Sequence, residues 1–136
     1  MLRVRDRTVI EFLLLVSIVG CGKTGPALAP VHGRVTLDGE PVGWATVMFQ
    51  PDASGSPSYG NTDQDGRYVL GYKRGQQGAA IGSHMVRILS DKAIPGPDGK
   101  PMKRPHPIPA RYSASSDQKR EVTPGDNEIN FELTTK

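Results

Sequence analysis

The sequence predicts an all-β domain in which short antiparallel strands form two stacked sheets. A chain of 136 residues is long enough for one domain with one core. Its 16 glycines and 12 prolines interrupt the sequence often, which favours short strands joined by turns over long helices. Beyond residue 30, apolar and polar residues alternate in one run after another, and this period of two is typical of strands with one buried face.

Two strands are predicted in the first part of the domain, over "VHGRVTL" (31–37) and "ATVMFQ" (45–50). The segment "DGEPVGW" joins them, and its Asp38-Gly39 pair is a strong turn signal. Apolar residues lie on one face of each strand, so we expect that face in the core. The predicted core residues of these strands are Val31, Val35, Leu37, Ala45, Val47 and Phe49.

Five further runs complete the predicted sheets. They are "SYGNT" (58–62), which is the weakest, then "RYVLGY" (67–72), "SHMVRILS" (83–90), "KREVT" (119–123) and "EINFELT" (128–134). Their apolar faces are predicted to carry Tyr68, Leu70, His84, Val86, Ile88, Ile129, Phe131 and Leu133. Seven short strands with one apolar face each are best buried as two stacked sheets.

Residues 1–20 have the pattern of a secretion signal. Three arginines lie among the first seven residues, and the apolar run "FLLLVSIV" (12–19) follows them. This run is shorter than the roughly 20 apolar residues that an ordinary transmembrane helix needs. Gly20 then precedes Cys21, which is the single cysteine of the chain and so cannot form an internal disulfide.

The stretch "IVGC" (18–21) resembles the lipobox of bacterial lipoproteins. This resemblance implies that the chain is cut before Cys21, that the thiol carries a diacylglycerol and that the new amino terminus is acylated. Two or more acyl chains hold a protein firmly on a membrane. The alternative is a free thiol in a leader that is discarded. Residues 21–30 have no periodicity and are predicted to be a tether to a domain over 31–136.

Five blocks of the predicted domain have the order and spacing of a known family. They are "GRVTLDGEPVGWATVMFQP", "TDQDGRYVL", "GAAIGSHMVRI", "IPARYS" and "VTPGDNEINFEL". Through them the chain resembles the carboxypeptidase regulatory-like, transthyretin-like domains of small bacterial lipoproteins. The resemblance implies a seven-stranded Greek-key β-sandwich of the transthyretin (prealbumin) type, outside the cytoplasm and mostly without an assigned activity. Trp44 stands where these domains commonly have a small residue, as either a packing anchor or an exposed contact.

The segment "DQDG" (63–66) has two carboxylates, two residues apart, as at the start of many calcium loops. The closing position of such a loop would be Arg74, a cation, so we expect a turn in which Gly66 has a positive φ. His32, His84 and His106 have no partner at i+2 or i+4, and a metal site would need assembly across strands. We therefore expect neither a metal nor a cofactor.

Catalysis is not expected from this sequence. Transthyretin-like hydroxyisourate hydrolases share a C-terminal Tyr-Arg-Gly-Ser signature, whereas this chain ends "NFELTTK". No Gly-x-Ser-x-Gly elbow of a serine hydrolase is present either. A divergent transthyretin-like hydrolase remains an alternative. The net charge of +3, without interleaved aromatic and basic residues, argues against a nucleic-acid partner.

Residues 91–112, "DKAIPGPDGKPMKRPHPIPARY", form a long connection with six prolines and a net charge of +3. Connections beyond about 12 to 15 residues are usually functional or disordered. The segment is interpreted either as a solvated insertion or as a recognition surface for an anionic glycan or an envelope protein. Its candidate binding residues are Lys100, Lys103 and Arg104.

The functional expectation is a lipoprotein of the bacterial cell envelope, on the extracytoplasmic side and bound to the membrane through lipid on Cys21. It would act as a structural or binding module without catalytic activity. The alternative in the binding class is a carbohydrate- or protein-recognition domain that uses the basic, proline-rich segment. The sequence leaves the ligand open.

Overall fold

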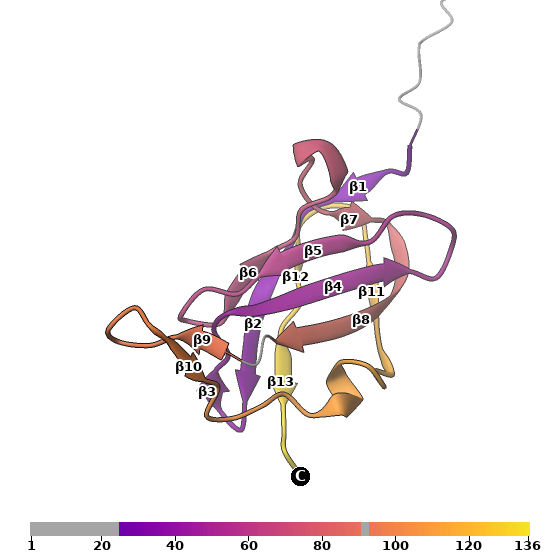
Figure 1. Cartoon of the computed structure of the whole chain (residues 1–136). Helices are drawn as coiled ribbons and strands as arrows, with labels where there is room; N and C mark the ends of the chain where they lie inside the picture. The colour runs from indigo at the N-terminus through magenta and orange to yellow at the C-terminus, as the bar shows by residue number, and fades with distance from the viewer. Residues whose placement is uncertain (1–24, 91–92) are drawn as a thin grey trace, which may run out of the picture.

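The computed structural model describes residues 25–90 and 93–136, and this part of the chain is all-β, as predicted (Figure 1). The strands are β1 (Leu28–Ala29), β2 (Val31–Leu37), β3 (Glu40–Pro41), β4 (Ala45–Pro51), β5 (Ser58–Asn61), β6 (Arg67–Val69), β7 (Ala79–Ala80), β8 (Gly82–Ser90), β9 (Ala93–Pro95), β10 (Pro101–Lys103), β11 (Gln118–Val122), β12 (Asn127–Glu128) and β13 (Phe131–Leu133). Two 3₁₀ turns, η1 (Lys73–Gly75) and η2 (Ala110–Tyr112), are the helical segments within these ranges.

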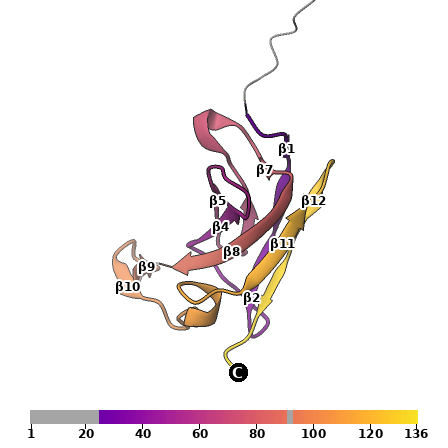
Figure 2. The same cartoon turned by 90° about the vertical axis from the view of Figure 1, so that its right-hand side faces the viewer.

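Two larger sheets form the body of the domain (Figures 1 and 2). One has the order β11-β8-β4-β5, with antiparallel neighbours throughout. In the other, β2 is central: β12 and β13 pair with it in parallel, whereas β3 and β6 pair with it antiparallel. All seven predicted runs contain strand. The other strands have two or three residues each, and segments that short carry no alternation.

The predicted burial pattern is confirmed in the long strands. All the predicted core residues are buried except Ile129, which is partly buried against the core. The ring of Phe131 in β13 lies 6.1 Å from that of Phe49 in β4 and 6.2 Å from that of Tyr68 in β6, centroid to centroid. Since β4 belongs to one larger sheet while β6 and β13 belong to the other, their apolar faces share one core.

The last predicted strand is broken into β12 and β13. Between them, the carbonyl of Ile129 accepts a hydrogen bond of 2.5 Å from the buried hydroxyl of Tyr68. A Cβ at Gly33 would lie 1.9 Å from that carbonyl oxygen, so only glycine allows this approach. The interruption therefore satisfies a phenol that would otherwise be buried without a partner.

The N-terminal boundary of the domain lies earlier than predicted. Leu28 and Ala29, assigned to the tether, form β1 and pair antiparallel with β7. Ala29 is buried in the core. Two adjacent apolar residues show no alternation with polar ones, so the pattern that predicts a strand from Val31 onward did not predict β1. Cys21, the signal segment and the first part of the tether lie outside the described residues.

The described part of the proline-rich connection is folded. Strands β9 and β10 form an antiparallel hairpin in which Ile94 faces Met102 across the pair. Its turn is closed by a hydrogen bond from the amide of Gly96 to the carbonyl of Lys100. The chain then runs to η2, where Tyr112 is buried. The hairpin projects from the end of the domain opposite β1 and β7 (Figures 1 and 2).

Candidate binding site

Trp44 is an exposed aromatic residue held in an unfavourable backbone conformation. It directly precedes β4, its φ is 58°, and 51% of its surface is exposed. A bulky residue with positive φ is an outlier, and such strain costs about 1 to 3 kcal/mol. The backbone is fixed on one side by Thr62, whose carbonyl accepts from the amide of Trp44 and whose hydroxyl accepts from that of Ala45. The sequence left open whether Trp44 is a packing anchor or an exposed contact, and in the structure its side chain is exposed.

Arg104 fixes the same segment from the other side. Its guanidinium donates hydrogen bonds of 2.8 Å to the carbonyls of both Gly43 and Trp44. Only 8% of Arg104 is exposed. Hydrogen bonds from a charged donor are stronger than those from a neutral donor. Arg104 therefore connects the proline-rich segment to the residue pair before β4.

A groove of about 490 Å³ lies between these elements. The turn after β2, the segment before β4, the hairpin strand β9 and the residues after β10 form its walls. Apolar and polar side chains both face it, a mixture typical of small-ligand sites of this size. The lining residues are Leu37, Glu40, Pro41, Val42, Gly43, Trp44, Gln64, Ile94, Arg104, Pro105 and His106. We call this the Trp44 groove.

The three predicted binding cations do not lie on one exposed surface. Lys100 and Lys103 are exposed on the β9–β10 hairpin, whereas Arg104 is buried at the wall of the Trp44 groove. Lys100 follows a turn in which its amide donates to the carboxylate of Asp98. The structure thus gives Arg104 a supporting position, and only the two lysines are placed to meet a ligand by charge.

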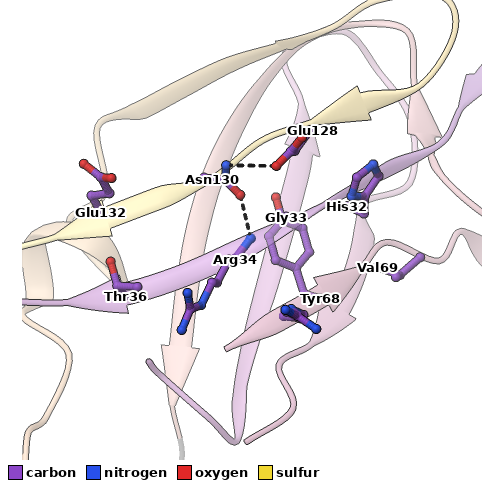
Figure 3. Close-up of a pocket in the computed structure, with 10 residues that line it drawn as sticks. His32, Gly33, Arg34, Thr36, Tyr68, Val69, Glu128, Asn130 and Glu132 are labelled. Atoms are coloured by element: carbon purple, nitrogen blue, oxygen red, sulfur yellow. Dashed lines mark hydrogen bonds between the residues drawn. The ribbon is translucent and has the colours of Figure 1, made fainter. Parts of the chain in front are cut away.

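A second hollow of about 550 Å³ lies on the outer face of the sheet around β2 (Figure 3). Side chains from β2, β6 and the β12–β13 segment surround it. Many of its polar groups already have partners. The backbone amide of Arg34 donates to the side-chain oxygen of Asn130, and the side-chain NH₂ group of Asn130 donates to the carboxylate of Glu128. The Nε of Arg34 donates to the carbonyl of Asp65. This pattern is typical of a solvated sheet face with cross-strand pairs.

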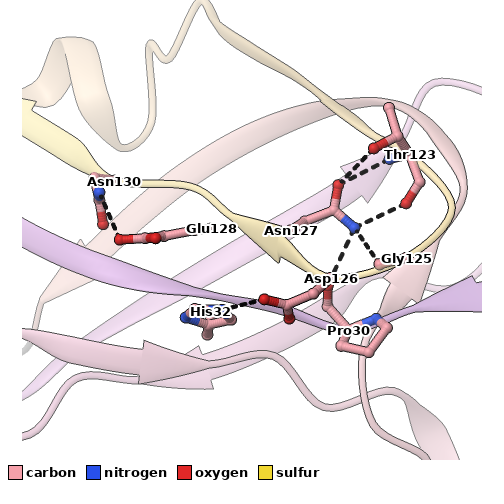
Figure 4. A network of polar contacts seen from close by, with 8 residues as sticks. All are labelled: Pro30, His32, Thr123, Gly125, Asp126, Asn127, Glu128 and Asn130. Carbon is pink, nitrogen blue, oxygen red and sulfur yellow. Dashed lines mark hydrogen bonds and ion pairs between the residues drawn. The ribbon is translucent and has the colours of Figure 1, made fainter.

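His32, at the edge of this second hollow, pairs with Asp126 (Figure 4). Its Nε2 lies 2.9 Å from a carboxylate oxygen of Asp126. This hydrogen bond raises the pKa of His32 above its usual value. Asp126 belongs to the turn between β11 and β12, so the pair connects that turn to β2.

Asn127 organises the same turn (Figure 4). Its side-chain oxygen accepts from the amide and hydroxyl of Thr123, and its NH₂ group donates to the carbonyls of Pro30, Thr123 and Gly125. Asn127 is buried, and these bonds satisfy its polar atoms. The sequence predicted the turn but not the hydrogen bonds of the Asn127 side chain, because a Gly-Asp-Asn segment is common in turns and does not show which backbone groups lie nearby.

The "DQDG" segment is the predicted turn. Gly66 has a φ of 77°, and Asp63 accepts hydrogen bonds from the amides of Asp65 and Arg67. The carboxylate of Asp63 therefore stabilises the turn by accepting from two backbone amides. Within residues 25–90 and 93–136, no three His, Cys, Asp or Glu side chains are grouped closely enough to hold a metal ion.

His84 and His106 lie in different surroundings from His32. His84 is buried on the apolar face of β8, with its ring 5.6 Å from that of Phe49 and its Nε2 2.6 Å from the carbonyl of Ala80. His106 lines the Trp44 groove.

Among the residues that the structure describes, no helix is long and apolar enough to cross a membrane.

Comparisons with known proteins give a similarity of fold only. No family model and no curated protein matches the chain. It is similar to the crystal structure of a DUF3823 family protein from Parabacteroides merdae ATCC 43184, with a TM-score of 0.43 and 15% identity over 79% of this chain and 46% of the other. It is also similar to a 9R-lipoxygenase from Cyanothece PCC8801, with a TM-score of 0.42 and 19% identity over 82% of this chain and 17% of the other. The chain spans less than half the length of either protein.

Proposed function

We propose that this chain is a lipid-anchored lipoprotein of the bacterial cell envelope that binds a sugar chain in the Trp44 groove, without catalysis. Its fold would be the seven-stranded Greek-key sandwich of the carboxypeptidase regulatory-like, transthyretin-like domains. That fold is supported by the strand content of all seven predicted runs and by the core that the two larger sheets share.

The position of Trp44 carries the proposal. A half-exposed tryptophan on a strained backbone costs free energy twice, through its exposed apolar surface and through its φ of 58°. The backbone conformation is maintained from two separate segments, because Thr62 accepts a hydrogen bond from the amide of Trp44 and Arg104 donates one to its carbonyl. Strained residues cluster at binding and catalytic sites because the surrounding structure must be built to hold them.

A sugar is the ligand that suits the composition of this groove. The flat indole of Trp44 offers an apolar face to the C–H face of a sugar ring. Glu40, Gln64 and His106 line the same groove and supply acceptors and donors for hydroxyl groups. The exposed Lys100 and Lys103 on the adjoining hairpin favour an anionic glycan over a neutral one.

The proposal of a non-catalytic role is supported by the chemistry of the groove. Its titratable side chains are Glu40, His106 and Arg104, and the guanidinium of Arg104 is bonded to two backbone carbonyls. The groove residues include a single carboxylate, that of Glu40, whereas glycoside hydrolysis commonly uses a pair of carboxylates.

Binding is tested with the soluble domain and a panel of neutral and anionic envelope polysaccharides. Trp44→Ala should abolish retention on the polysaccharide that the wild type binds. Tyr59→Ala is the matched control, because Tyr59 is 49% exposed but lies on β5, outside the groove. Equal retention of wild type and Trp44→Ala on every glycan would contradict the sugar site, and retention of an envelope protein alone would point to a protein partner.

The anionic preference has its own test. Changing Lys100 and Lys103 together to Gln should weaken retention on an anionic polysaccharide and leave that on a neutral one unchanged. Added salt should weaken the wild type in the same way, because exposed charges are screened over about 8 to 10 Å at physiological ionic strength. Arg104 is left unchanged in this variant, because its guanidinium donates to the carbonyls of Gly43 and Trp44, which line the groove.

The lipid anchor is tested in cells. Cys21→Ser should leave an unprocessed precursor that takes up no labelled palmitate, since Cys21 is the only cysteine of the chain. The wild type should be labelled and should begin at Cys21. A wild-type protein that purifies without lipid, or that begins at another residue, would contradict the anchor while leaving the sugar site open.

A further inference from the structure

The end of the domain opposite the Trp44 groove carries a basic turn. Figures 1 and 2 show β1 and the η1 turn together at the end where the described chain begins, and the β9–β10 hairpin at the other end. Lys73 and Arg74 are exposed in η1. They share a hollow of about 760 Å³ with residues 25–28, the segment that leads into β1.

The structure of this turn presents its two cations outward. Arg74 and Gly75 have positive φ values of 61° and 73°, and the amide of Tyr72 donates to the carbonyl of Gln76 across the turn. Tyr72 is buried beneath it, with the amine of Lys73 5.6 Å from its ring centroid. The turn is therefore fixed to the domain by a buried side chain and a closing hydrogen bond.

The two cations are not neutralised within the described part of the chain. The ion pairs found there join His32 to Asp126 and Lys119 to Asp52. No acidic side chain lines the hollow beside Lys73 and Arg74; the residues that line it are Gly25, Pro26, Ala27, Leu28, Tyr72, Lys73, Arg74 and Gln76. The η1 turn is thus complementary to an anionic surface.

The proposed anchor would place such a surface beside the turn. Gly25 lies four positions after Cys21, and a fully extended chain of that length spans at most about 14 Å. Because Gly25 lines the same hollow as Lys73 and Arg74, lipid on Cys21 would hold this end of the domain within reach of the headgroups. This step rests on the proposed function.

We propose that the η1 turn is a membrane-docking surface, in which Lys73 and Arg74 bind the anionic headgroups of the bilayer that holds the anchor. Docking orients the domain so that the Trp44 groove faces away from the membrane. Two basic residues near an anionic surface shift the ratio of docked to undocked domain by about 30-fold, from about 1 kcal/mol each. This is sufficient only because the tether already keeps the turn near the bilayer.

The test uses the chain from Cys21 onward, with the thiol coupled chemically to a maleimide lipid, so that it does not depend on lipidation in cells. Trp44 is the only tryptophan and lies in the groove beside the β9–β10 hairpin, away from η1, which makes it a natural energy-transfer donor. The protein is anchored on vesicles that contain a dansyl-labelled lipid as acceptor. Vesicles of phosphatidylcholine alone are compared with vesicles that also contain phosphatidylglycerol.

On the anionic vesicles, energy transfer from Trp44 should be low for the wild type, because docking keeps the groove end away from the bilayer. Changing Lys73 and Arg74 together to Gln should raise it, as should high salt. On phosphatidylcholine both proteins should give the higher value. The matched control, Lys100 and Lys103 changed to Gln, removes two cations from the hairpin and should leave transfer low.

Equal transfer for wild type and the Lys73/Arg74 variant on anionic vesicles at low salt would overturn the docking surface. So would an equal rise in the Lys100/Lys103 control. Thermal melting of all three proteins checks that the exposed substitutions leave the fold intact. A native protein without lipid would contradict the anchor but not this result, since the coupled protein carries its lipid in either case.

Discussion

At the scale of single residues, Trp44 combines a positive φ with an exposed apolar ring, and the free-energy cost of each can be measured separately. Glycine adopts a positive φ freely, whereas alanine keeps the strain and removes only the ring. The two substitutions therefore separate the backbone strain from the indole. Both remove the proposed binding surface, so a loss of binding that they share is assigned to the ring.

Trp44→Gly should yield a protein that is more stable than Trp44→Ala by about 1 kcal/mol, the usual penalty for a side chain in the left-handed region. Neither variant should bind the glycan. Urea unfolding at matched pH gives the two free energies of unfolding. Equal stability of the two variants would mean that the φ of 58° at Trp44 is not strained in the folded protein.

His32 gives a prediction for pH. Its hydrogen bond with Asp126 raises its pKa in the folded state above the ordinary value of 6.5. Folding is therefore favoured by protonation: the contribution is complete below pH 6.5, where the unfolded state is protonated too, and is lost as the pH rises through the folded pKa. NMR titration of Asp126→Asn should show the pKa of His32 lowered toward 6.5. An unchanged pKa would mean that the pair does not form in solution.

At the scale of elements, alternation predicted strands and turns but missed the supports of the groove. Alternation identified β2, β4 and β8 because each of these strands buries one face. The turns were predicted from Asp38, Gly39 and Gly66, and all three residues have the positive φ values that such turns need. The sequence predicted Arg104 to be an exposed binding cation, because a pattern of charges does not show that two backbone carbonyls lie within hydrogen-bonding distance of its guanidinium. The structure supplies that contact from a segment 60 residues away.

Arg104→Met tests the connection between the proline-rich segment and the residues before β4. It keeps much of the side-chain volume but leaves the carbonyls of Gly43 and Trp44 without their donor, which should cost about 2 to 3 kcal/mol. Lys103→Met is the control at an exposed neighbour and should change stability by less than about 0.5 kcal/mol. Similar melting temperatures for the two variants would contradict the supporting position of Arg104.

At the scale of the whole molecule, Phe131 joins the two larger sheets. It is 1% exposed, and its ring contacts Phe49 across the core and Tyr68 beside it. Phe131→Ala should cost about 3 to 5 kcal/mol, because the cavity would open between the sheets, where neither can move in to fill it. The free energy of unfolding in urea gives this value. A loss below about 1 kcal/mol would mean that the two sheets do not share this core.

The pairing of β2 with β12 and β13 has a consequence for the order in which the protein can fold. Val31 lies beside Asn127 and Leu37 beside Leu133, so the first long strand takes two of its neighbouring strands, β12 and β13, from the last part of the domain. Contacts between such distant parts of a chain form slowly. Until β13 has been synthesised, β2 lacks one neighbour and its apolar face lacks Phe131. For the export that we propose, this topology would delay folding until the last strand of the domain has been synthesised.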